Sequence, residues 1–321
     1  MEQQVCLAMD LGGTKLLIGE VTADGTIHNC RRYPSRLGGG AAQREMTEDV
    51  LNALRDYRTH SDAKPTCAAL GAVGRIDSER GLWLEIEPRR CETIDLASML
   101  QNELGVPCFV NNDVQCALMA EQKLGWGRLS QDYIYINVGT GIAAGIVTGG
   151  HVVTGASFNA GEVGHTVVSP QTGAQCPCGR VGCVEAIAAG SGLDRRARTL
   201  ARQYASTALL LPEGHICDAG EVFELARKGD ALCLRLACDA ADALAALIMN
   251  LVWVTDPDTV VLGGGVASDE WMQDQIQQRL LPSTMRFVRN GVVTTRLNPH
   301  YIGLIGAGIT GLEGIKGGAK A

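Results

Sequence analysis

The stretch N-A-G-E-V-G-H (residues 159–165), followed ten residues later by C-P-C-G-R-V-G-C-V-E (176–185), organises this chain. It places one imidazole and three thiols within a single loop, at the short spacings that a tetrahedral Zn²⁺ site needs. Glycines between the thiols allow the tight backbone turns by which the sulfurs converge. The stretch therefore predicts a closed, structural zinc site that holds this loop in one conformation. Its candidate ligands are His165, Cys176, Cys178 and Cys183.

Other interpretations of these residues stay open on the sequence alone. A C-x-C pair can be redox-active, and thiols in a reducing compartment can be inert. A single histidine often has only a structural hydrogen-bonding role, so it is the cysteines after His165 that make it a candidate ligand. Glu162 and Glu185 bracket the ligands, so a loop held by zinc would present two acids at fixed positions.

The composition is that of a folded globular protein with a small-molecule role. A length of 321 residues suits two domains, and 46% of the residues are hydrophobic. Apolar runs stay shorter than the roughly 18 residues of a membrane span. The net charge of −7 disfavours nucleic-acid binding. The chain enters an apolar strand soon after Met1 without a signal-peptide pattern, so we expect a cytoplasmic protein whose twelve cysteines are reduced.

Strand and helix patterns alternate along the chain, as is typical of an α/β fold. A three-strand meander starts the chain and a second begins near Tyr133, each with a glycine-rich turn after its first strand. This coarse repeat predicts two similar halves. The predicted strands are 5–9, 16–21, 26–32, 67–73, 106–110, 132–138, 142–148, 259–262 and 292–296, and the predicted helices are 43–58, 94–104, 114–124, 192–204, 219–228, 231–253, 269–280 and 304–313.

Three glycine turns follow strands: D-L-G-G-T-K (10–15), G-T-G (139–141) and G-G-G (263–265). Backbone N–H groups in such turns can hold a phosphate without obstruction by a Cβ atom. None of the turns matches the Walker A sequence or the dinucleotide-binding fingerprint. One glycine turn alone is usually only a turn, but three in two halves predict a nucleotide held between two lobes.

Two acids next to predicted strand ends are candidates for chemistry. Asp10 can hydrogen-bond the first glycine turn, or it can hold Mg²⁺ on the phosphates directly or through water. Asp113 can be an ordinary residue at a helix N-terminus, or a base that accepts the proton of an attacking hydroxyl group. Asn112 would orient a neighbouring hydroxyl, and Lys15 can be merely a solvated strand residue.

The motifs D-L-G-G-T-K, N-N-D, V-G-T-G, G-E-V-G-H and C-P-C-G-R-V-G-C-V-E, in this order, resemble the ROK family of repressors, open reading frames and sugar kinases. The resemblance extends from Asp10 to the closing segment I-G-L-I-G-A-G. It implies a two-lobed α/β ATPase fold of the actin/hexokinase (ribonuclease H-like) type, with a central nucleotide and sugar cleft. Residues 1–118 would form the N-terminal lobe, completed by a C-terminal helix at about 303–321, and residues 119–302 the other lobe, with the zinc loop 159–185.

The resemblance also implies an ATP-dependent sugar kinase that uses Mg²⁺ and phosphorylates a hydroxyl group, expected to be O6, of a hexose or N-acetylhexosamine. Asp113 would be the catalytic base. The implied sugar-binding residues are Asn112, Asp113, Glu162, His165 and Glu185, with His165 also bound to zinc. The implied ATP-binding residues are Asp10, Gly12, Gly13, Thr14, Lys15, Gly139, Thr140, Gly141, Gly264 and Gly265.

The alternatives are a ROK repressor that binds a sugar as inducer, and a sugar-binding pseudo-kinase without turnover. The family's repressors carry an N-terminal helix-turn-helix, for which the strand beginning at Val5 leaves no room. Retention of Asp10, Lys15, Asn112 and Asp113 favours catalysis. The expected partners are ATP and a sugar, without nucleic acid or membrane, and a homodimer is expected because family members are often dimers.

Two segments depart from the family pattern where it concerns sugar recognition. Many ROK kinases have a Pro-Gly pair where this chain has A-V-G-R (72–75), and a P-N-L-x-x-W-like stretch where it has E-I-E-P-R-R-C-E (85–92). Arg75, Arg89 and Arg90 could contact an unusual sugar substituent or be surface charges. The sequence leaves glucose, N-acetylglucosamine and N-acetylmannosamine open as substrates.

Overall fold

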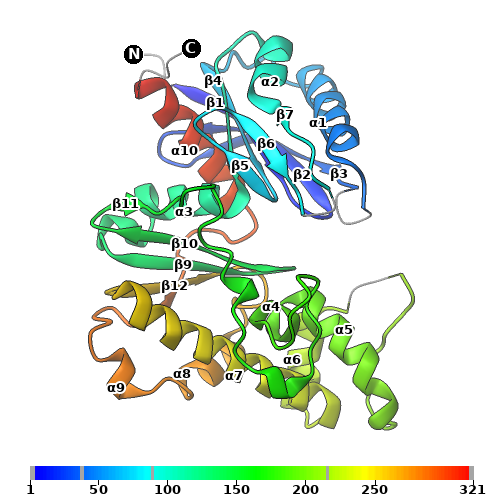
Figure 1. Ribbon diagram of the computed structural model, residues 1–321. Coiled ribbons are helices and arrows are strands. Elements are labelled where there is room, and N and C mark those ends of the chain that lie inside the picture. Colours follow the sequence, from blue (N-terminus) through cyan, green and yellow to red (C-terminus); the bar gives the residue numbers. More distant parts are fainter. Residues whose placement is uncertain (1–3, 37–39, 88–89, 215–216, 318–321) are drawn as a thin grey trace. The chain divides into compact units, whose positions relative to one another are not determined.

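The computed structural model describes residues 4–36, 40–87, 90–214 and 217–317 (Figure 1), so Arg89 lies outside the described residues. Contacts divide the chain into two compact units. Unit 1 comprises Met1–Arg128, Thr154–Ala160 and Arg296–Ala321, and unit 2 comprises Leu129–Val153 and Gly161–Thr295. The lobe boundaries given above from the sequence stay a prediction.

Unit 1 is built on a five-stranded sheet of order β3-β2-β1-β4-β8. Strands β1 (Val5–Leu11), β2 (Lys15–Thr22) and β3 (Ile27–Pro34) form the predicted antiparallel meander, and β4 (Cys67–Ala72) and β8 (Cys108–Asn112) run parallel to β1. Of the parallel strands, β1 and β4 are almost fully buried and mostly apolar, as expected of strands covered on both faces.

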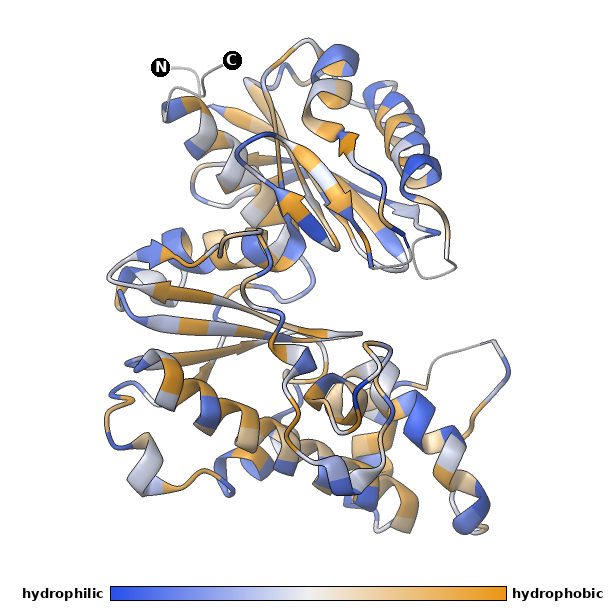
Figure 2. Ribbon diagram, viewed as in Figure 1, coloured by the Kyte–Doolittle hydropathy of each residue, from blue (hydrophilic) through white to orange (hydrophobic). Residues whose placement is uncertain are grey.

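Helices cover both faces of this sheet. Alternate residues of a strand point to opposite faces, so Leu7 packs in the cluster of α1 (Gln43–Arg58) and α2 (Leu96–Leu104). Ala8 lies instead in the cluster of α3 (Asp113–Leu124) and α10 (Ile302–Lys316). Figure 2 shows hydrophobic strands between these helices and mixed polar and apolar residues along α1.

Helix α10 approaches α3 closely because it carries a glycine at the contact. A Cβ atom on Gly306 would lie 1.7 Å from the carbonyl oxygen of Cys116 on α3. A separation this short is impossible for real atoms, so only glycine allows the two helix backbones to approach in this way. Gly306 in the closing segment therefore determines how closely α10 packs against α3.

Unit 2 repeats the topology of unit 1. Its sheet has the order β11-β10-β9-β12-β13. Strands β9 (Tyr133–Val138), β10 (Ile142–Thr148) and β11 (His151–Val152) form the second predicted meander, while β12 (Thr259–Gly263) and β13 (Val292–Thr294) are parallel to β9. The repeat predicted from the sequence is thus present at the level of the sheets.

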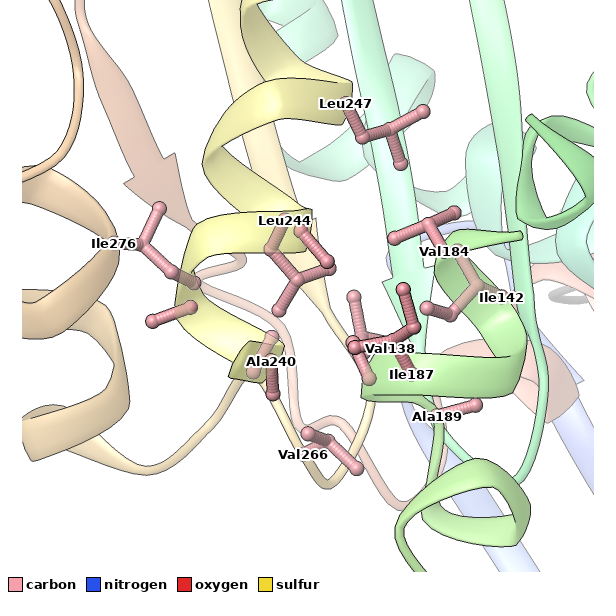
Figure 3. Packing of buried hydrophobic residues seen from close by; sticks show 14 of the residues in the cluster. Val138, Ile142, Val184, Ile187, Ala189, Ala240, Leu244, Leu247, Val266 and Ile276 are labelled. Carbon is pink, nitrogen blue, oxygen red and sulfur yellow. The ribbon is translucent and has the colours of Figure 1, made fainter. Parts of the chain in front are cut away.

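The core of unit 2 lies between this sheet and α7 (Ala231–Thr255), at the position of the helix predicted over 231–253. Figure 3 shows Leu244 and Leu247 of α7 beside Val184 and Ile187 of α4 (Val184–Ala188). Although α7 is long, no helix in the described parts of the chain has the length and apolar character to cross a membrane. The other helices are α5 (Gly190–Leu200), α6 (Ala219–Arg227), α8 (Glu270–Gln277) and α9 (Pro282–Met285).

The structure corrects the sequence-based assignments in the three places described below. Strands β5 (Arg75–Asp77), β6 (Leu82–Glu85) and β7 (Ile94–Asp95) form a small antiparallel sheet that was not predicted. The helix predicted over 94–104 begins at Leu96, because the side chain of Asp95 accepts a hydrogen bond from the Ser98 N–H and caps it. The helix predicted over 192–204 spans 190–200, followed by a 3₁₀ turn at 201–203.

We predict that Gly306→Ala destabilises unit 1 because its methyl group cannot be placed without separating α10 from α3. Overpacking against backbone should cost about 1–3 kcal/mol, or a fall in melting temperature of about 3–10 °C by calorimetry. Gly317→Ala is the matched control, because its Cβ would lie 3.6 Å or more from its neighbours and its φ is −71°. Equal melting temperatures of the two variants would contradict the conclusion that the contact between α10 and α3 requires glycine at position 306.

Candidate active site

In unit 1, the predicted site residues gather at one edge of the sheet. Strands β1, β4 and β8 are parallel, with Asp10 opposite Gly71 and Ala72 opposite Asn112. Their carboxyl ends therefore meet, which is where ligands bind in α/β sheets. Directly after β1, the turn Gly12–Lys15 is closed by a hydrogen bond from the Gly12 N–H to the Lys15 carbonyl oxygen at 2.9 Å.

Asn112 has a structural function that the sequence did not reveal. Its Oδ1 accepts hydrogen bonds from the N–H groups of Val114 at 2.9 Å and Gln115 at 3.1 Å, so it caps α3. Its Nδ2 donates to the carbonyl oxygen of Gly74 at 2.9 Å. The Asn112 amide also hydrogen-bonds the Asp113 carboxyl group and acts to lower its pKa, so Asn112 holds Asp113 in place as well as capping α3.

Asp113 is the first residue of α3 and is half-buried. Burial raises the pKa of its carboxyl group to about 6, even though a hydrogen bond from the Val114 N–H at 2.9 Å favours the charged form. A carboxylate with a pKa just below neutrality is a stronger base than an ordinary aspartate and is still ionised at pH 7. The position and the pKa both fit a general base.

Asp10 lies close enough to Asp113 for the two charges to interact. Burial and, to a smaller extent, repulsion from Asp113 raise the pKa of Asp10 to about 7, and Lys15 opposes the shift. Hard oxygen ligands with an excess of negative charge are what Mg²⁺ prefers, so these residues fit a Mg²⁺ ion held with ATP. The contact of Gly303 on α10 with this carboxylate was not predicted from the sequence. A Cβ atom added at Gly303 would lie 2.8 Å from Asp10 Oδ2.

In unit 2, two predicted glycine turns lie side by side. Strands β9 and β12 are parallel neighbours, with Asn137 opposite Gly263, so both turns follow the same sheet edge. The N–H of Val266 donates to the Val138 carbonyl oxygen at 2.9 Å. Gly264 has a φ of +86°, and a Cβ there would lie 2.4 Å from the same oxygen. Glycine is therefore required at 264 for the two turns to touch.

The G-T-G turn is also held by the N-terminus of α5, which the sequence did not indicate. The N–H groups of Gly190 and Ser191 donate to the carbonyl oxygens of Gly139 and Thr140 at 2.9 and 3.1 Å. N–H groups at a helix N-terminus lack acceptors within the helix, and here the carbonyl oxygens of the turn are their acceptors. The G-S-G sequence that opens this helix is the signal that could have predicted the contact.

Glu185 connects three of the predicted motifs. Its Oε2 accepts a hydrogen bond from the Ile142 N–H, directly after the G-T-G turn, at 3.0 Å. Added Cβ atoms on Gly141 and Gly164 would lie 2.8 and 3.2 Å from this oxygen. The carboxylate therefore lies between the G-T-G turn and the 3₁₀ helix Val163–His165, which follows Glu162. Unit 2 thus brings Glu162, His165 and Glu185 to one region.

The four predicted metal ligands form one cluster. Their ligand atoms all lie within 4.8 Å of one another. The Cys178 and Cys183 sulfurs are 3.7 Å apart, and the Cys176 sulfur is 3.5 Å from His165 Nδ1. Zinc bond lengths of about 2.3 Å to sulfur and about 2.0 Å to nitrogen imply tetrahedral separations of about 3.8 and 3.6 Å. The cluster therefore fits zinc, with Nδ1 as the ligating atom of His165.

Outside this cluster the cysteines do not form a disulfide framework. All twelve are free thiols, in agreement with the expectation from the sequence.

The two segments that depart from the family pattern, 72–75 and 85–92, contain ion pairs. Arg75 pairs with Glu85 and Arg90 pairs with Glu87, both at 3.0 Å. Both arginines therefore have ion-pair partners within the protein. Such pairs occur in arginines with a structural role and in arginines that bind a substrate.

Two sheets of the same topology in one chain place this protein in the α/β fold of the actin/hexokinase class. The chain belongs to the ROK family, whose model matches residues 6–310. It is 30% identical to a glucokinase from Halalkalibacterium halodurans over 83% of this chain and 82% of that protein. It is 31% identical to an N-acetylmannosamine kinase from Escherichia coli over 94% and 97% of the two chains.

A solved structure agrees with these relatives. A ROK family glucokinase from Streptomyces griseus, in complex with glucose and AMPPNP, superimposes with a TM-score of 0.78 at 26% identity, covering 97% of this chain and 100% of that one. The predicted family and fold class are confirmed. The individual roles of the site residues stay predictions.

Proposed function

We propose that this protein transfers the γ-phosphate of ATP to a hydroxyl group, O6 by expectation, of a hexose or N-acetylhexosamine, with Asp113 as general base. The enzyme class, an ATP:sugar phosphotransferase, follows from the family and from relatives named glucokinase and N-acetylmannosamine kinase. The observation that carries the assignment of the base is the half-buried Asp113 with its raised pKa, beside Asn112 at a carboxyl edge of the sheet.

In the proposed reaction, the sugar hydroxyl oxygen forms a bond to the γ-phosphorus as its proton passes to a carboxylate oxygen of Asp113. The bond from the γ-phosphorus to the β,γ-bridging oxygen breaks, and ADP leaves with the electron pair. A carboxylate with a pKa of about 6 accepts this proton more readily than one near 4. Asn112 would help to orient the hydroxyl next to Asp113, because its amide contacts both the Gly74 carbonyl oxygen and the Asp113 carboxyl group.

The glycine turns are proposed to bind ATP. Among the described residues, no acceptor is found for the N–H groups of Thr140 and Gly141, so both remain for phosphate oxygens. Gly12, Gly13, Thr14 and Lys15 would bind phosphate from unit 1, and Gly264 and Gly265 the adenosine side from unit 2. Mg²⁺ bound with ATP would neutralise phosphate charge, and Asp10 is the residue proposed to hold it, directly or through water.

Glu162, His165 and Glu185 are proposed to bind sugar hydroxyl or acetamido groups. With His165 Nδ1 facing the thiol cluster, its Nε2 is the ring nitrogen left for the sugar. A structural zinc ion would thus fix the orientation of a substrate-binding imidazole. The acids and the imidazole accept or donate hydrogen bonds to hydroxyl groups of either a hexose or an N-acetylhexosamine.

We also propose a homodimer in the reducing cytoplasm. The free thiols support a reducing compartment. Large apolar side chains exposed on unit 2 support self-association: Trp253 is 64% exposed, Val254 79% and Phe287 61%. Exposed aromatic residues of this kind are enriched in protein interfaces.

The direct test is ADP release by the purified protein with Mg·ATP and a sugar panel. The panel comprises glucose, mannose, fructose, allose, N-acetylglucosamine and N-acetylmannosamine. We expect one sugar to stimulate turnover and Asp113→Asn to reduce it by about 10²–10⁴-fold, because the variant cannot accept a proton. Calorimetric titration should show that the variant still binds the sugar.

Two results would overturn this proposal. Full turnover by Asp113→Asn would remove Asp113 as the base. A sugar that raises the melting temperature of the wild-type protein without stimulating ADP release would favour the sugar-binding regulatory protein or pseudo-kinase.

The pH dependence provides a second prediction. The base must be ionised, so kcat/KM for the sugar at saturating Mg·ATP should be constant above the pKa of Asp113, about 6, and fall about tenfold per pH unit below it. Measurement between pH 5 and 8 checks the slope. A rate that stays constant down to pH 5 would show that Asp113 does not act as a base with this pKa.

The zinc proposal is tested by Cys178→Ser, which removes one thiolate from the cluster. We expect the variant to lose stoichiometric zinc by mass spectrometry of the metal and to melt at a lower temperature, since metal binding stabilises the folded loop. Cys30→Ser is the matched control, because Cys30 is an exposed thiol outside the cluster. Unchanged metal content in Cys178→Ser would refute the Cys₃His assignment.

A further inference from the structure

A cavity of about 240 Å³ in unit 1 lies apart from the proposed substrate residues. It is lined by residues of β1, the last turn of α1, the segment after α1 and the end of α2. Leu7 lies in the first half of β1, and Val106 precedes β8. Asp10 and Asn112 lie at the opposite, carboxyl ends of these two strands.

The polar side of this cavity is fixed by a buried carboxylate. Glu20 is only 7% exposed and accepts hydrogen bonds from Tyr57 Oη at 3.0 Å, Ser61 Oγ at 2.5 Å and Asn29 Nδ2 at 3.0 Å. Burial acts to raise the pKa of Glu20, but these hydrogen bonds outweigh it and lower the pKa below its usual value. Glu20 therefore stays ionised and holds the two hydroxyl-bearing side chains that line the cavity.

The charged side chains in the described lining of the cavity are cations, although the carboxylates of Glu20 and Glu103 lie just outside it. Arg58 and Lys64 line it, and its lining in the described part of the chain includes no aspartate or glutamate. The hydroxyl protons of Tyr57 and Ser61 are donated to Glu20, so the donors left for a ligand come from the two cations. Arg58 Nη1 donates to the Glu103 carbonyl oxygen at 3.1 Å, which uses one of its five N–H groups and holds the guanidinium at the cavity.

The remaining walls are apolar and match a small ligand. Leu7 is buried, and Leu104 and Val106 are half-buried beside it. A cavity of about 150 Å³ holds benzene, so this one suits about ten non-hydrogen atoms. Polar groups confined to one side of an apolar cavity select a ligand with a charged head and an apolar body.

We propose that this cavity binds a small anion with an apolar body, its carboxylate or phosphate head on Arg58 and Lys64 and its body against Leu7, Leu104 and Val106. The site is independent of the proposed kinase reaction. Its ligand would contact Leu7 of β1 and Val106, which precedes β8.

The test uses three probes of similar shape on the full-length protein: benzoate, phenyl phosphate and neutral benzamide. Ligand-observed NMR and calorimetric titration measure the binding of each. We expect at least one of the two anions to bind, and benzamide to bind at least about fivefold more weakly than that anion, because it lacks the charge. Binding of benzoate alone, phenyl phosphate alone or both assigns the head group.

Two variants and a control locate the site. Arg58→Gln/Lys64→Ala should raise the dissociation constant of the binding anion at least about fivefold, and Ala63→Phe should abolish binding by filling the cavity. Arg31→Gln/Arg32→Gln removes two exposed charges elsewhere in unit 1 and should leave binding unchanged. Absence of anion binding, equal binding of benzamide, or unchanged binding in both cavity variants would overturn the proposal.

Discussion

The parallel pairing of the first strand in each sheet is the constraint on which the other features depend. β1 begins an antiparallel meander and also pairs in parallel with β4, and β9 does the same with β12. Parallel pairing brings carboxyl ends to one edge, so residues distant in sequence, such as Asp10 and Asn112 on either side of β4, reach the same edge without any local signal between them. The same rule in unit 2 joins the G-T-G and G-G-G turns. Because the first strand of each sheet pairs in parallel in the same way, each unit has one sheet edge at which polar residues gather.

Close backbone approach is the second requirement, and it explains where glycine occurs. A Cβ at Gly264 would clash with Val138, and one at Gly141 with Glu185. These positions do not need flexibility; they need the absence of a side chain next to a carbonyl oxygen or a carboxylate. The Cys₃His cluster complements this arrangement. Val163, Ala174 and Val184 already anchor its loop in the hydrophobic core of unit 2, and a metal would add to the free energy that holds the loop.

Most elements could be predicted from the sequence because their patterns are local. The helix Gln43–Arg58 has its apolar residues at helical spacing, and the structure has the same bounds. β5 to β7 were missed because strands of two to four residues are too short to show alternation. The motif residues of the site were found, but their partners were not: the Gly74 carbonyl beside Asn112 and the Gly303 backbone beside Asp10 are long-range contacts of main-chain atoms, which have no residue-type signal.

The electrostatics of unit 1 connect the fold to the proposed chemistry. A carboxyl group whose pKa is raised in the folded state stabilises the fold only while it is protonated, and this contribution is lost as the pH rises through the folded-state pKa. For Asp113 and Asp10 these values are about 6 and about 7, so near neutrality the folded protein holds two carboxylates in an environment that disfavours their charge. The packing of α3 and α10 against the sheet maintains this arrangement. A cation bound with ATP or a proton from the sugar hydroxyl would relieve it, so the groups that destabilise the free protein are those proposed to act in the reaction.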